Sequence, residues 1–88
     1  NENLTDECIS QLPRNLKHLD LFYNKKLTNK CISQLPRKLE YFDLSHNNNL
    51  TDKCISQLPR DLKYLNLFNN KNINKKSIRK ELPNCKVY

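Results

Sequence analysis

The chain is built on the nine residues LKHLDLFYN at positions 16–24, which return in altered form at 39–47 and 62–70, each time 23 residues later. In the first copy Leu19 and Leu21 take alternate positions, which is the period of a strand with one buried face. An asparagine closes every copy. We therefore predict a β-strand in each copy, the first over 17–22, with the leucines turned inward.

The segments between the strands have the pattern of short helices. In 4–12 (LTDECISQL) Thr5 is a suitable N-cap, and the two acidic residues after it favour the first turn. Cys8, Ile9 and Leu12 fall on one face, and Pro13 ends the helix. Because it has barely two turns, this helix depends on packing against the strands. A 3₁₀ turn is the alternative.

The repeat organises the whole chain as one domain. The hexapeptide ISQLPR is unchanged at 9–14, 32–37 and 55–60. We divide the domain 1–88 into three units and a C-terminal cap with a closing helix and a short last strand: 1–26, 27–49, 50–72 and 73–88. Asn1 stands where a repeat asparagine would end a missing strand. We therefore expect the sequence to be a fragment of a longer protein.

Composition adds two constraints. The chain has 88 residues, no glycine and a net charge of +7. Without glycine, turns that need a positive φ are expected to use asparagine, the next most tolerant residue. The charge makes anionic partners worth considering but does not identify them. No apolar run approaches the roughly 20 residues of a membrane span.

Three of the four cysteines, Cys8, Cys31 and Cys54, occupy one repeat position. Three equivalent sites cannot all pair with one another, so we predict reduced, small and buried side chains. Reduced cysteines are typical of an intracellular protein, and we expect a cytoplasmic location.

The pattern L-x-x-[LF]-x-L-x-x-N, followed by [LI]-[TN] and I-x-x-L-P, resembles the leucine-rich repeat family over essentially the whole chain. It is similar also to cysteine-containing repeats of F-box-type proteins and to repeats of amoebae and giant viruses. The resemblance implies an α/β right-handed solenoid with a parallel β-sheet on the concave face and short helices or 3₁₀ turns on the convex face. It also implies inward asparagines, a protein-interaction module and no inherent catalytic activity.

Between the leucines lie the side chains that distinguish this chain. On stacked strands, equivalent outward positions form columns about 4.8 Å apart. Aromatic residues beside carboxylates and amides have the composition of interaction hot spots. We therefore expect a protein partner of unknown identity to contact three columns, although aromatic ladders that merely stabilise the sheet are the alternative. The columns are His18, Tyr41 and Tyr64; Asp20, Asp43 and Asn66; and Phe22, Ser45 and Phe68.

Other functions are less well supported. Arg14, Arg37 and Arg60 form a basic column before the strands, and lysines form others on the return segments, so nucleic acid or another polyanion is an alternative partner. No spacing indicates a catalytic group, a metal site or a cofactor, so we predict no enzyme activity. An exposed edge strand at 17–22 leaves end-to-end assembly as a structural alternative to a monomer.

Overall fold

The computed structural model describes residues 4–24, 26–47 and 49–88. Helices and strands alternate along the chain, as the sequence predicts, and the third helical segment is a 3₁₀ helix. In chain order the elements are α1 (Asp6–Ile9), β1 (His18–Asp20), α2 (Asn29–Ser33), β2 (Tyr41–Asp43), η1 (Asp52–Gln57), β3 (Tyr64–Asn66), α3 (Lys75–Glu81) and β4 (Lys86–Val87).

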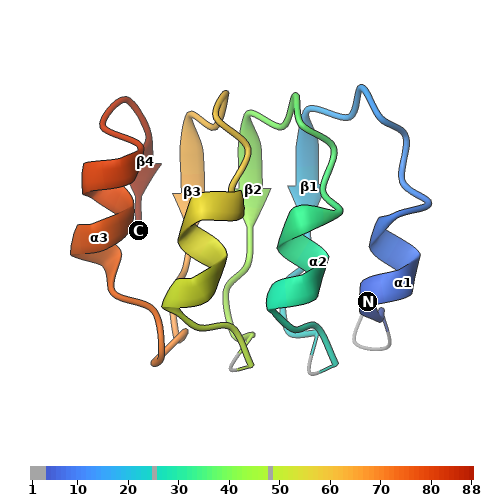
Figure 1. Ribbon diagram of the computed structural model, residues 1–88, viewed down its shortest axis with the longest axis horizontal. Helices are drawn as coiled ribbons and strands as arrows, with labels where there is room; N and C mark the ends of the chain where they lie inside the picture. The colour runs from blue at the N-terminus through green and yellow to red at the C-terminus, as the bar shows by residue number, and fades with distance from the viewer. Residues whose placement is uncertain (1–3, 25, 48) are drawn as a thin grey trace.

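The four described strands form one parallel sheet in the order β1-β2-β3-β4. The first three strands pair at the repeat offset, so that His18 faces Tyr41 and Tyr41 faces Tyr64. In the last pair Tyr64 faces Lys86, one residue short of that offset. The helices stand side by side in a second layer, in the same order (Figure 1). The sequence-predicted parallel strands, the closing helix and the short last strand are confirmed, although the strands are shorter than 17–22 suggests.

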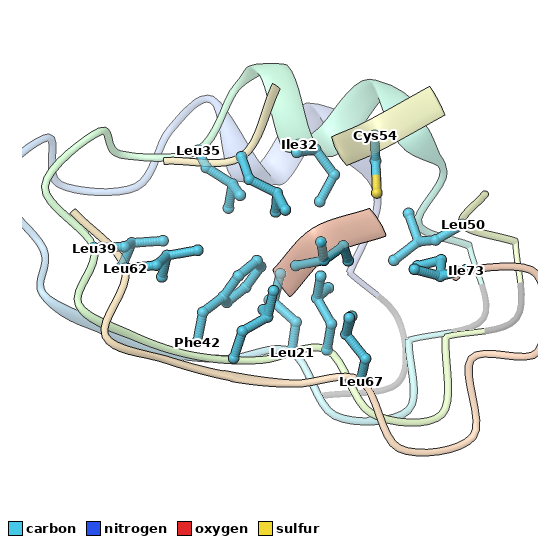
Figure 2. Close-up of a cluster of buried hydrophobic side chains, with 14 of the residues drawn as sticks. Leu21, Ile32, Leu35, Leu39, Phe42, Leu50, Cys54, Leu62, Leu67 and Ile73 are labelled. Atoms are coloured by element: carbon cyan, nitrogen blue, oxygen red, sulfur yellow. The ribbon is translucent and has the colours of Figure 1, made fainter. Parts of the chain in front are cut away.

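The hydrophobic core fills the space between the two layers. Figure 2 shows Ile32 and Leu35 pointing from the helical layer toward Leu21, Phe42 and Leu67 of the strand layer. These five side chains are 0–3% exposed. Leucines of the first unit that correspond to buried residues in later units are only partly buried: Leu4, Leu12, Leu16 and Leu19.

The position of each unit in the stack also decides whether its cysteine is buried. The prediction of buried side chains is right for Cys31 and Cys54 but wrong for Cys8, which is exposed. Cys8 lies on α1, and among the described residues no helix covers the side of α1 that faces away from α2. All four thiols are free. Asn1, on which the prediction of an incomplete first repeat depends, lies outside the described residues.

A threonine stands at the N-cap of the first three helical segments, and Asn74 at that of α3. The side chains of Thr28 and Thr51 accept hydrogen bonds from the backbone N–H of Lys30 and Lys53, as expected of N-caps. Thr5 stands at the N-cap of α1 without this bond. The prediction that Thr5 is an N-cap is therefore right in position, but the capping hydrogen bond is found at Thr28 and Thr51 rather than at Thr5.

The repeat asparagines turn inward and bind the backbone of adjacent strands, as the resemblance implies. Asn47 is fully buried, and its Nδ2 donates to the carbonyls of Leu21 and Leu44 at 2.8 and 2.9 Å. Its Oδ1 accepts from the backbone N–H of Asn24 at 3.2 Å, which joins one unit to the next. Asn70 Nδ2 likewise donates to Leu44 O. The asparagines therefore belong to the scaffold.

The residue before each inward asparagine has a left-handed backbone: φ is 56° at Tyr23, 62° at His46 and 59° at Asn69. The expectation that asparagine serves at positive φ is right at Asn69 and wrong at the other two positions. The turn imposes this backbone on whichever residue stands there, at a cost of about 1–2 kcal/mol for a bulky side chain. Tyr23 and His46 thus project from the ends of the strands.

Candidate functional site

The helices cover one face of the sheet, and the side chains of the opposite face, here called the open face, form the candidate site. Its first row consists of His18, Tyr41 and Tyr64. The rings are stacked face to face, with centroids 4.4 and 4.7 Å apart and planes within 5° and 10° of parallel. Lys86 from β4 extends the row, with its Nζ 5.6 Å from the centre of the Tyr64 ring. The predicted aromatic column is therefore a continuous stack.

The second row is Asp20, Asp43 and Asn66, and each member closes a turn after its strand. The Oδ1 atoms of Asp20 and Asp43 accept hydrogen bonds from the backbone N–H two residues later, at 2.9 and 2.8 Å. Asn66 Oδ1 makes the same bond at 3.0 Å. An amide oxygen accepts this hydrogen bond as well as a carboxylate oxygen does. The turn therefore explains why a short polar side chain stands at each position of the row, but not why two of the three are negatively charged.

The third row differs from the prediction at its centre. Phe22 and Phe68 are 46% and 58% exposed, but Ser45 is only 3% exposed. The hydroxyl of Ser45 donates to Asp43 Oδ1 at 2.6 Å, so this short side chain lies down against its own strand. The prediction that Ser45 is an outward contact residue is therefore wrong, because Ser45 is a buried turn residue.

His46 takes the place between the two phenylalanines. Its ring lies edge to face against Phe22 and Phe68, with centroids 5.0 and 5.5 Å apart. Its Nδ1 is 3.2 Å from the Asn69 side-chain nitrogen, an amide group that can only donate. Sequence alternation places His46 beyond the strand, and only its left-handed backbone brings the ring into this row.

A hollow of about 540 Å³ lies on the open face. Its lining includes the first two rows and Tyr88, which the sequence does not indicate as a surface residue of the sheet. Tyr88 reaches the hollow because its backbone N–H donates to Leu65 O at 2.9 Å, continuing β4 along β3. The lining residues are His18, Leu19, Asp20, Tyr41, Phe42, Asp43, Tyr64, Asn66 and Tyr88.

The arginine column predicted at the surface is held by the backbone. Arg37 donates from Nη1 to Gln57 O and from Nη2 to Ile32 O, at 2.8 and 2.7 Å. Arg14 makes the equivalent bonds one unit earlier, while Arg60 binds both the carbonyl and the carboxylate of Glu81. These guanidinium groups satisfy carbonyls at the ends of helical segments, which normally lack partners. They are consequently less available to a phosphate backbone than the sequence suggests.

The chemistry of the remaining groups is limited. Within residues 4–24, 26–47 and 49–88, no three His, Cys, Asp or Glu side chains are grouped to hold a metal ion. Burial, with smaller effects of nearby anionic groups, raises the pKa of Cys31 to about 12 and of Cys54 to about 11. Such thiols stay protonated near neutral pH and are poor nucleophiles.

Cys8 is different, because hydrogen bonds from the backbone and side chain of Thr5 lower the pKa of its exposed thiol. We expect iodoacetamide to alkylate Cys8 in the native protein, with half-maximal rate at a lower pH than for an ordinary exposed cysteine, while Cys31 and Cys54 react only after unfolding. The reason is that only the thiolate reacts. Mass spectrometry of peptides after timed labelling measures this. Equal labelling of Cys8 and Cys31 in native protein would contradict the burial difference.

No helix in the described part of the chain is long and apolar enough to cross a membrane.

In comparisons with known proteins, a family model described as a leucine rich repeat matches residues 13–32 and 36–56. The first match contains β1 and α2 up to Ile32, and the second contains β2 and η1 up to Ser56. No curated protein matches the chain. Domains of the matched kind generally act as protein-interaction scaffolds and are typically not enzymes.

Proposed function

Because the chain belongs to the leucine-rich repeat family, we propose that it is a non-enzymatic scaffold that binds a protein partner on the open face of its sheet. In the solenoid architecture that we propose for it, right-handed as in the family, the open face is the concave one. We place the scaffold in the cytoplasm, consistent with its free cysteines.

The observation that carries this proposal is the exposure of aromatic side chains on the open face. Phe22, Tyr41 and Phe68 are 46%, 37% and 58% exposed. None of them fills the core, which lies on the other side of the sheet. Solvent-exposed aromatic residues beside polar groups are typical of surfaces that are buried by a partner.

Replacement of Tyr41 and Tyr64 together by alanine is expected to abolish partner binding while the fold persists. Each ring lies on the open face, so its loss removes contact area and about 0.5–1.5 kcal/mol of stacking per ring pair, with little effect on the core. The measurement is affinity capture from a cell extract with wild-type and variant domains, together with circular dichroism to confirm folding.

The matched control replaces Lys30 and Lys53, which are exposed on the helical layer, by alanine. This variant should capture the same proteins as wild type. If the tyrosine variant folds and captures them equally well, binding does not use the open face and the proposal is wrong.

End-to-end assembly is less well supported as an alternative. The described units are joined by side chains that reach the next unit: Thr28 N–H donates to Asp6, and Arg37 donates to Gln57 O. In the last unit the corresponding positions are Lys75 and Asn84. A lysine cannot accept a hydrogen bond and a short amide cannot reach as an arginine does, so this end lacks the usual connections.

A further inference from the structure

We propose that the hollow on the open face receives an arginine side chain of the protein partner, whose guanidinium group binds the carboxylates of Asp20 and Asp43 together. This inference rests on the proposed function and specifies the chemistry of the partner. Its basis is a pair of negative charges that the fold does not require, beside a stacked row of aromatic rings.

The two carboxylates each keep one oxygen for a partner. Asp20 and Asp43 use Oδ1 to accept backbone N–H groups, and their Oδ2 atoms have no partner within residues 4–24, 26–47 and 49–88. The ion pairs found in that part of the chain, Arg60–Glu81 and Lys63–Glu40, do not involve them. On a chain of net charge +7, these two charges are therefore left without a counter-ion.

Their spacing suits one guanidinium group. Asp20 and Asp43 are register partners on adjacent strands, which lie about 4.8 Å apart. Like charges this close repel one another, and a cation between them removes the repulsion. A guanidinium group is planar and has five N–H donors along its edges, so it can bind two carboxylates at once.

The walls of the hollow also favour arginine. The rings of the first row line the hollow together with the carboxylates, and the ring cluster of Phe22, His46 and Phe68 lies two to three residues further along the chain. Arginine stacks on aromatic rings and is less strongly hydrated than lysine. Lys86 already lies over the Tyr64 ring, which shows that this row accepts a cation from within the chain.

The same features disfavour a nucleic acid on this face. Phosphate groups would be repelled by Asp20 and Asp43, and the arginines that could attract them bind backbone carbonyls elsewhere. A protein segment, in contrast, can present one arginine flanked by apolar residues. Arginine is among the residues that contribute most to binding energy at protein interfaces.

The chain itself supplies a conservative test. Asn66 makes the same turn as the two aspartates, so the variant Asp20→Asn/Asp43→Asn should keep the turns and the melting temperature while losing both charges. Random dodecapeptides displayed on phage and selected on the wild-type domain are the probe. We expect the selected peptides to share an arginine and to bind the double variant roughly 30-fold or more weakly.

Two further measurements complete the test. Replacing the shared arginine by citrulline, which has nearly the same shape but no charge, should weaken binding to wild type by a similar factor and have little effect on the double variant. Asn66→Asp, which adds a third carboxylate to the row, should strengthen binding of the arginine peptides.

The outcomes separate this inference from the proposed function. Peptides that lose binding to Tyr41→Ala/Tyr64→Ala but contain no shared arginine and bind the aspartate variant normally would overturn the inference alone. Selected peptides that bind both variants as tightly as wild type, or no enrichment of any peptide, would overturn both proposals.

Discussion

Replacing Asn47 by alanine should destabilise the domain by roughly 3–6 kcal/mol, enough to unfold much of it at 25 °C. The Asn47 amide is fully buried, and its Nδ2 donates to the carbonyls of Leu21, Leu44 and Ser45 at 2.8, 2.9 and 3.1 Å. Its Oδ1 accepts the backbone N–H of Asn24. Alanine would leave the Asn24 N–H buried without this acceptor and open a cavity between two units. It would also remove one of the two donors to each carbonyl, which would keep only the bonds from Asn24 Nδ2, Asn70 Nδ2 and the Tyr23 N–H.

Urea unfolding followed by circular dichroism measures the loss, and Asn70→Ala is the matched control. Asn70 Nδ2 makes two comparable bonds, to Leu44 O and Leu67 O, but Asn70 Oδ1 has no hydrogen-bond partner among the residues that the structure describes. We therefore expect Asn70→Ala to cost less, by about the 1–3 kcal/mol of one buried N–H group. A loss at Asn70 that equals or exceeds the loss at Asn47 would show that the Asn24 bond is unimportant.

Repetition made this part of the molecule predictable. An asparagine that returns at one place in every unit, next to alternating leucines, has the same neighbours each time, so one pattern fixes several contacts. Asn24 and Asn47 are inward, and Leu21, Leu44 and Leu67 are buried, as the alternation indicates. The strand order follows from the same regularity, because each unit pairs with the next in register.

The wrong predictions of burial concern positions where burial depends on the length of the side chain or on the neighbouring units. Ser45 has the alternation of Phe22 and Phe68, yet its hydroxyl folds back onto Asp43, which no period reveals. Cys8 has the sequence surroundings of Cys31, but lies beside one helix rather than between two. Burial at such positions is a property of the stack, and sequence periodicity contains no information about which unit stands at its edge.

In the candidate site, too, some residues follow from strand alternation and others do not. The aromatic column His18, Tyr41 and Tyr64 follows from strand alternation and is found stacked. His46 and Tyr88 could not be predicted, because they reach the face through a left-handed turn and through the extension of β4. The sequence offered one signal for His46: a bulky residue directly before the inward asparagine in a chain without glycine.

The arginine column has a structural role that its sequence pattern does not reveal. Arg37→Ala should destabilise the domain by roughly 2–4 kcal/mol, because the carbonyls of Leu35 and Gln57 lose their donor and that of Ile32 keeps only backbone N–H groups. The Gln57 bond connects two units, so its loss also weakens the stack. Burial, together with the charge of Arg14, lowers the pKa of Arg37.

Arg60→Ala is the matched control, since Arg60 occupies the same place one unit later. Its guanidinium binds Glu81 through one carbonyl bond and an ion pair whose side chains are 55% and 40% exposed. Exposed ion pairs contribute about 0–1 kcal/mol, so Arg60→Ala should cost clearly less than Arg37→Ala. Arg37→Lys should fall between them, because lysine keeps the charge but not the fork of donors. If Arg37→Ala and Arg60→Ala prove equally mild in urea unfolding, the column is a solvated surface after all.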